Sequence, residues 1–136
     1  MSNKDINLKE KFRIALTSTA KVISDDFTLN DKSSENKKTK SSEILEINDL
    51  TNPSDFIKLR AETDSVALKK KFSNDTIYRK NLPSNNSSRS LYNIAEKIRY
   101  ESLGGKMLKG IEKNFTENYT QIIKCKKKGS NERFRM

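Results

Sequence analysis

Six polar residues in the middle of the chain have the types and spacing that chemistry requires: Arg60, Asp64, Ser65, Glu96, Arg99 and Glu101. Carboxylates act as general acids or bases where a site tunes their pKa, and guanidinium groups bind carboxylates through charge-assisted hydrogen bonds. Arg60 and Asp64 are one helical turn apart, and Glu96 and Arg99 are three residues apart. Both spacings allow an ion pair within a helix.

Asp64 falls on the apolar face of its predicted helix, with Ser65 at the edge of that face. An unpaired buried charge costs several kcal/mol, so this carboxylate must be paired or lie at an interface. One interpretation is a bond to Arg60 or to a neighbouring helix, and the other is a role in partner binding or catalysis. Glu101 lies on the opposite flank of its helix from Glu96 and Arg99, within reach of Arg60 or of another helix's basic group.

The composition excludes several kinds of site. The chain has no histidine and a single cysteine, Cys125, so a Cys–His nucleophile is excluded and transition-metal ligands are scarce. The glycine-rich loop G-x-x-x-x-G-K-[ST], which binds nucleotide phosphates, does not occur. We therefore predict no catalytic, cofactor-binding or metal-ligating residue in this chain.

The net charge is +10, and residues 119–136 contribute six basic groups against one acidic group. Lysine is much commoner than arginine, the better residue for bidentate contacts to phosphates or bases. The charge is therefore interpreted as solvation with weak affinity for acidic partners, and nucleic acid is disfavoured. No apolar run approaches the roughly 18 residues of a membrane span, and no signal-peptide core is present, so a cytoplasmic protein without a membrane partner is expected.

Hydrophobic periodicity predicts an α+β fold that is mostly helical: a helix, a small β-hairpin, then three helices packed in one core. A helix is expected over 7–24, capped by Asn7, and hairpin strands over 27–29 and 43–47. The predicted domain covers residues 1–120, with the hairpin at about 26–48. Residues 121–136 are predicted to be a basic, flexible tail. The first helix is expected to bury Leu8, Phe12, Ala15, Leu16, Thr19, Val22 and Ile23.

Three further helices are predicted. Asn52 and Pro53 begin one that runs to about Phe72 or Asn74, buries Ile57, Ala61, Leu68 and Phe72, and exposes Lys69, Lys70 and Lys71. Ser87 or Ser88 caps the next, which Gly104-Gly105 ends after Leu103. Its expected inner stripe is Leu91, Ile94, Ala95, Ile98 and Ser102. The last aligns Leu108, Ile111, Phe115, Tyr119 and Ile122, and is either antiparallel to its neighbour or bent from it.

Three sequence blocks resemble a known family. R-A-E-T-D-S-V-A-L at 60–68 is similar to the R-G-H-A-D-S-I-A-L segment of the cobaltochelatase CobT subunit, with Glu62 in place of the usual histidine. Residues 91–115 resemble that family's E-x-x-R-x-E-x-x-G…G-V-x-x-N-L pattern. The matching positions are Glu96, Arg99, Glu101, Gly104, Gly110 and Asn114. Residues 11–24 are similar to the family's opening segment, so the likeness spans most of 8–119.

The resemblance implies a subunit of the ATP-dependent complex that inserts cobalt into a corrin ring in cobalamin biosynthesis. In that family an AAA+ ATPase subunit hydrolyses ATP, a large subunit holds the tetrapyrrole, and CobT couples the two. The complex uses ATP, magnesium and cobalt, none of which this chain is expected to bind itself. Full-length members continue into a von Willebrand A-type domain with a D-x-S-x-S motif, which is absent here. The expectation is an amino-terminal domain or a truncated relative, without the metal-dependent adhesion function.

The resulting hypothesis is a non-catalytic assembly domain whose partner-binding or structural polar cluster is the six residues named first. The alternative is a stand-alone basic helical protein that binds nucleic acid or an acidic protein. It would act through Lys124, Lys126, Lys127, Lys128, Arg133 and Arg135. An independent enzyme is the third class, and it requires that Asp64, Glu96 and Glu101 converge on one cleft.

Overall fold

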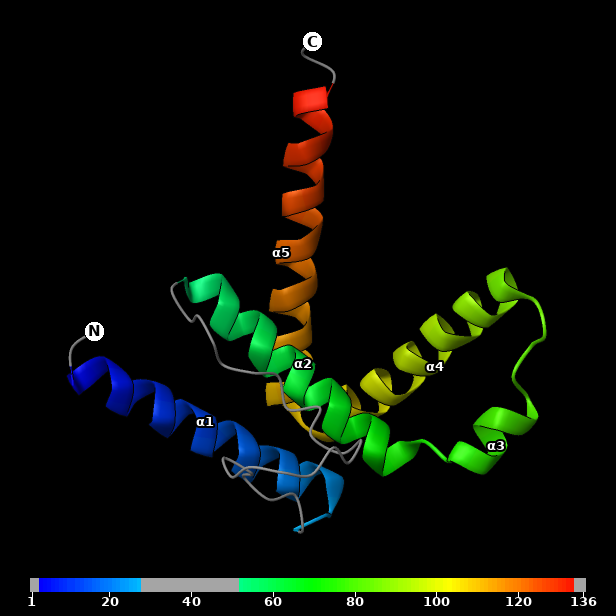
Figure 1. Cartoon of the computed structure of the whole chain (residues 1–136), viewed down its shortest axis with the longest axis horizontal. Helices are drawn as coiled ribbons and strands as arrows, with labels where there is room; N and C mark the ends of the chain where they lie inside the picture. Colours follow the sequence, from blue (N-terminus) through cyan, green and yellow to red (C-terminus); the bar gives the residue numbers. More distant parts are fainter. Residues whose placement is uncertain (1–2, 28–51, 134–136) are drawn as a thin grey trace, which may run out of the picture.

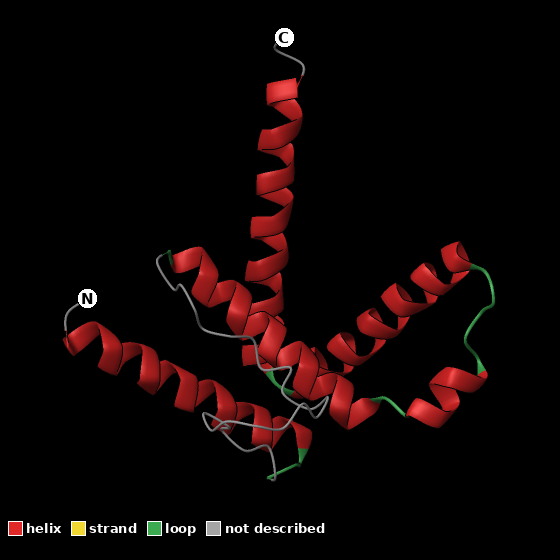
Figure 2. Cartoon of the chain, viewed as in Figure 1, coloured by secondary structure: helices red, strands yellow, loops and turns green. Residues whose placement is uncertain are grey.

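The computed structural model describes residues 3–27 and 52–133, which form five α-helices and no strand (Figure 2). The helices are α1 Asn3–Ser24, α2 Pro53–Phe72, α3 Asp75–Lys80, α4 Asn86–Met107 and α5 Lys109–Arg133. None of these described helices is both long and apolar enough to cross a membrane.

The predicted α+β class is wrong for the described part of the chain, whereas the prediction of a mostly helical fold is confirmed. Phe27, the first residue of the predicted hairpin, lies in a turn after α1, and the rest of that hairpin lies outside the described residues. Asp25 ends α1 in the left-handed region at φ 55°, and the Asp26 N–H donates to the Lys21 carbonyl at 3.2 Å. This Schellman-type hydrogen bond ends α1 in a turn.

Helix α2 is the centre of the fold and packs against α1, α4 and α5 (Figure 1). Its Leu68 side chain is 1% exposed and its Ala61 and Ala67 are almost as deeply buried. The core is completed by Ala20 and Ile23 of α1, Tyr100 of α4, and Ile111 and Phe115 of α5. Alanines on α2 let the neighbouring helices approach closely, so three of them can share a single central helix.

Both ends of α2 agree with the prediction. Asn52 is the N-cap, Pro53 is the first helical residue, and the Asn52 N–H donates to the Asp55 carboxylate at 3.3 Å. The helix ends at Phe72, where the Ser73 N–H donates to the Lys69 carbonyl. Local capping chemistry was sufficient to place this helix.

Helix α1 starts at Asn3 rather than behind an Asn7 cap, and its buried face is rotated from the predicted one. Leu8 and Val22 are exposed, although both were expected inside. The buried residues are Leu16, Thr17, Ala20, Ile23 and Ser24. Among the described helices α1 touches only α2, which covers a narrow stripe, and the buried hydroxyls bond to carbonyls one turn back.

Helix α4 departs most from its prediction. Its expected inner stripe is exposed, with Leu91 69% and Ile98 59% accessible. The helix does not stop at Gly104-Gly105 but continues to Met107. A Cβ on Gly104 would lie 2.4 Å from two carbons of Leu68, so this glycine is a packing contact with α2 rather than a helix end.

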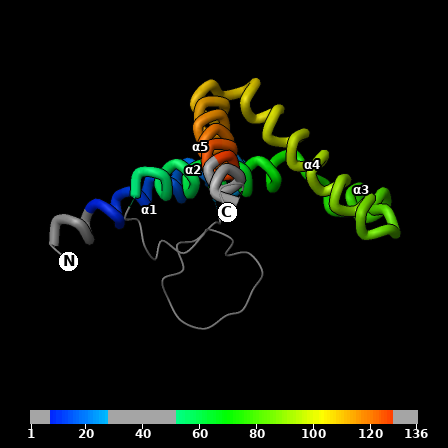
Figure 3. Tube along the Cα trace, turned by 90° about the horizontal axis from the view of Figure 1, so that it is seen from above, coloured from blue at the N-terminus to red at the C-terminus, as the bar shows by residue number. Residues whose placement is uncertain are grey.

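Helices α4 and α5 are joined through Leu108 and diverge from that joint, which makes them a bent pair (Figures 1 and 3). Ile111 and Phe115 are buried as predicted, whereas Leu108 and Ile122 are exposed. The predicted basic tail begins inside α5, whose helical backbone runs to Arg133. Short α3 contacts the far part of α4 through the rings of Tyr78 and Tyr92.

Candidate functional site

The six predicted site residues are distributed along α2 and α4 and do not meet in one cleft. Asp64, Glu101 and Glu96 each line a different hollow, of about 480, 610 and 330 Å³ respectively. The convergence that an independent enzyme would need is therefore not found for these three carboxylates. The described residues contain no group of three side chains suited to hold a metal ion.

Asp64 is buried on α2, as predicted, but its hydrogen-bond partner is on α5. The Asn114 amide donates to the Asp64 carboxylate at 2.7 Å, and Asp64 is only 2% exposed. Burial raises the pKa of Asp64, against the opposing effects of the Asn114 bond and the Arg60 charge. Arg60 is exposed and lines the same hollow without forming a described ion pair with Asp64.

Ser65 and Glu101 do meet, and with Tyr119 they join three helices. The Ser65 hydroxyl donates to one oxygen of Glu101 and the Tyr119 hydroxyl to the other, each at 2.6 Å. Lys97 Nζ lies 3.7 Å from Glu101, so the basic neighbour comes from α4 itself rather than from Arg60. Burial and then the bond to Glu101 raise the pKa of Tyr119, which keeps this hydroxyl a donor.

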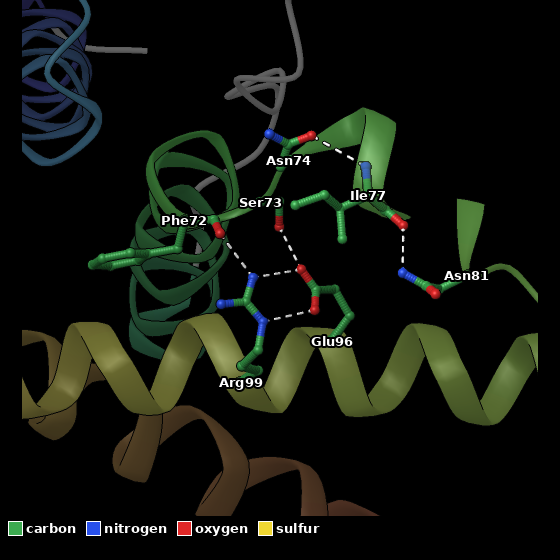
Figure 4. Close-up of polar contacts among 7 residues, drawn as sticks. All are labelled: Phe72, Ser73, Asn74, Ile77, Asn81, Glu96 and Arg99. Atoms are coloured by element: carbon green, nitrogen blue, oxygen red, sulfur yellow. Dashed lines mark hydrogen bonds and ion pairs between the residues drawn. The ribbon is translucent and has the colours of Figure 1, made fainter. Parts of the chain in front are cut away.

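Glu96 and Arg99 form the predicted pair, and the pair also fastens the end of α2 to α4 (Figure 4). Arg99 donates to both oxygens of Glu96, at 2.8 and 2.6 Å, and to the Phe72 carbonyl at 2.8 Å. The Ser73 hydroxyl donates to Glu96 at 2.8 Å. Phe72 is the last residue of α2, so Arg99 satisfies a carbonyl that the helix itself leaves open. The bond from Arg99 lowers the pKa of Glu96.

Three residues outside the predicted cluster supply the partners of its carboxylates: Asn114, Tyr119 and Ser73. Of these, the sequence had indicated only Asn114, as a position of the family pattern. Asn114 lies beside Phe115 on α5, and a polar residue next to a buried stripe was the available signal. The sequence placed Tyr119 on the apolar stripe of its helix and could not indicate which residue its hydroxyl would contact. The lysines of α2 were predicted to be solvated, yet Lys70 pairs with Asp26 and Lys71 with Asp25, which ties α2 to the end of α1.

The described part of the chain is thus an all-helical domain in which hydrogen bonds and ion pairs join a central helix to its neighbours. Residues 7–133, which include nearly all of the described helices, match the family described as cobalamin biosynthesis protein CobT. The chain belongs to this family, and membership supports a role in cobalamin biosynthesis. No curated protein matches the chain. No solved structure matches it either.

Proposed function

We propose that this chain is a non-catalytic assembly domain of a cobaltochelatase, supporting ATP-dependent insertion of cobalt into a corrin ring. Its partners in this proposal are the AAA+ ATPase subunit and the large tetrapyrrole-binding subunit. ATP and magnesium serve the ATPase, and cobalt is the substrate metal. Membership of the CobT family supports this assignment.

The observation that carries the proposal is the amount of apolar surface that the described helices leave exposed to solvent. Among the described residues, fourteen large hydrophobic side chains are exposed, whereas only ten hydrophobic residues, three of them alanines, are buried. Apolar surface in excess of what a monomer needs is typical of protein–protein interfaces. Assembly with another chain would remove this surface from water.

The polar cluster supports a structural role for most of its members. Asp64, Ser65, Glu96, Arg99 and Glu101 all bond within the chain and join α2 to α4 or α5. Arg60 and Arg99 are both exposed, but Arg99 is bonded to Glu96 and Phe72 whereas Arg60 has no described ion pair, which makes Arg60 the residue best placed to face a partner. We therefore assign Arg60 to partner binding and the other five to positioning the helices.

Co-purification with the cognate ATPase and large subunits tests this assignment. We expect the chain to migrate with at least one of them at low salt, and Arg60→Glu to weaken that association. Lys58→Glu, two residues away on the exposed side of α2, is the matched control. A chain that elutes separately from both subunits at low salt would contradict the assembly role.

One observation favours the alternative, binding of nucleic acid: Lys124 and Lys127 are exposed on the far part of α5. Binding of this kind depends steeply on salt and not on sequence. Removal of residues 121–136 tests this alternative, because it should abolish binding to duplex DNA, whereas the contribution of Arg60 to a cobaltochelatase contact does not depend on these residues.

A further inference from the structure

A groove of about 610 Å³ lies in the angle between α4 and α5. Its apolar wall is made by Ile98 on α4 and by Tyr119 and Ile123 on α5, whose exposed fractions are 59%, 39% and 54%. The two helices diverge away from their joint (Figure 1). Buried Phe115 also lines it, so the groove continues the hydrophobic core outward.

Lysines flank this groove at both ends. Lys106 and Lys109 line it near the joint. At the other end Lys124 and Lys127 follow Thr120 and Ile123 by one helical turn, which places them on the face of α5 that forms the groove wall. None of the described acidic side chains forms an ion pair with Lys106, Lys124 or Lys127.

The acidic residues of the groove do not balance these charges. Glu101 is paired with Lys97 of the same helix, whose Nζ lies 3.7 Å from it. Glu112 pairs with Lys109 at 3.0 Å. The groove therefore combines an apolar wall with a net positive border.

We propose that this α4–α5 groove binds an acidic amphipathic helix of a partner protein. The helix would place its apolar side chains against Ile98, Tyr119 and Ile123 and its carboxylates beside the flanking lysines. This inference rests on the proposed assembly role and adds the surface and the chemistry of the partner. A second copy of the chain fits less well, because it would bring the same lysines together.

The shape of the groove favours a helix as the occupant. Two diverging helices offer rows of side chains spaced by three and four residues, which match the apolar face of a third helix. An extended peptide that binds by adding a strand needs an open sheet edge, and the described residues contain no strand. Completing the angle between α4 and α5 with one more helix would also cover the exposed half of α4.

The test uses the full chain labelled with an environment-sensitive fluorophore at Cys125, its single cysteine, which is exposed on α5. The probe is a synthetic helical peptide of about 18 residues with leucines on one face and glutamates on the other. The control peptide carries lysines in place of the glutamates. We expect the glutamate peptide to bind at least about tenfold more tightly than the lysine peptide, and to weaken as salt is raised.

Variants locate the binding. The double substitution Ile98→Glu with Ile123→Glu should weaken binding of the glutamate peptide by about tenfold or more. Ile14→Glu on α1, also an exposed isoleucine, is the matched control and should bind like the wild type. All three positions are exposed, so the variants are expected to fold, as circular dichroism will verify.

Four results would overturn the inference: equal binding of the two peptides, unchanged binding by the groove variant, a wild-type dimer that the groove variant dissociates, or preference for a short duplex DNA over the glutamate peptide. Assembly with the cognate subunits separates this inference from the proposed function. If the groove variant co-purifies as well as wild type, the groove is wrong and the assembly role stands. If the peptide binds in the groove but no subunit associates, the groove stands and the cobaltochelatase role fails.

Discussion

Asp64 is the most deeply buried charged side chain in the described part of the molecule, and its surroundings show how this fold handles polar groups. Its carboxylate accepts a bond from Asn114, and it lies beside a hollow that Arg60 also lines. Glu101 also accepts one neutral donor on each oxygen, and in addition the Nζ of Lys97 lies 3.7 Å from it. Neutral donors satisfy these carboxylates at lower desolvation cost than a buried ion pair would.

Burial raises the pKa of Asp64 above its usual value. The carboxyl therefore contributes stability while it is protonated, below its unfolded pKa of about 4, and loses that contribution as the pH rises through the folded value. Asp64→Asn keeps an acceptor for Asn114, so we expect it to be more stable than wild type near about pH 7, with the advantage disappearing toward about pH 3. Urea denaturation across this range measures the difference.

Asp64→Ala is the companion variant. It leaves the Asn114 amide without its partner, and we expect it to lower the free energy of unfolding by about 1–3 kcal/mol. A wild type that gains stability relative to Asp64→Asn as the pH rises would contradict the account of this carboxylate.

At the scale of single elements, Gly104 allows α4 to approach α2. A Cβ there would lie 2.4 Å from Leu68, a side chain that is only 1% exposed. Gly104→Ala is expected to destabilise the protein by about 1–3 kcal/mol through overpacking, despite alanine's better helix propensity. Gly110→Ala is the control, because no atom lies within 4 Å of the added Cβ. Equal unfolding midpoints for the two variants would refute close packing at Gly104.

The hydrogen bonds by which Glu96 and Arg99 join α2 to α4 give a second test at the scale of single elements. The lowered pKa of Glu96 means that its contribution is present above its unfolded pKa and is lost as the pH falls through the folded value. We expect Glu96→Gln to cost about 1 kcal/mol near neutral pH and less in acid. Glu112→Gln, which breaks only the exposed pair with Lys109, should cost a few tenths at most, about 0.3 kcal/mol. Thermal unfolding of both variants compares them, and equal losses would argue against a fastening role for Glu96.

The exposed half of α4 provides a third test. Leu91→Gln and Ile94→Gln should each change the free energy of unfolding by about 0.5 kcal/mol or less, because both side chains already contact water. Ile111→Ala in the core should cost about 2–5 kcal/mol. Losses at Leu91 or Ile94 comparable to that at Ile111 would mean that the stripe is buried within the chain.

Local sequence signals predicted where the helices lie better than which face of each helix is buried. Asn52 and Pro53 placed the start of α2 because capping depends on adjacent residues alone. The stripe of α4 follows helical periodicity, but periodicity does not say whether the chain itself or a partner covers it. Glycine is typical of a helix end. Only the contact of Gly104 with Leu68 shows that this glycine serves packing. The Glu96–Arg99 pair was predictable from spacing, whereas its bonds to Phe72 and Ser73 depend on how α2 and α4 cross.

The described molecule consists of a packed centre around α2 and of two arms, which are the outer parts of α4 and α5. Polar bonds and the core hold α2 against its three neighbours, while the outer parts of α4 and α5 present apolar and basic side chains to solvent. The short joint at Leu108 and the contacts of α2 with both helices set the angle between these two arms. This division between centre and arms is the physical basis for assigning an assembly role to a member of the CobT family.

Amide hydrogen exchange of the full chain, alone and mixed with the cognate cobaltochelatase subunits, tests the assembly role most directly. We predict that the subunits slow exchange in residues 91–98 of α4 and in residues 119–127 of α5, and leave the largely buried residues 63–68 of α2 unchanged. Exchange that is identical with and without the subunits, or protection confined to α1, would contradict it.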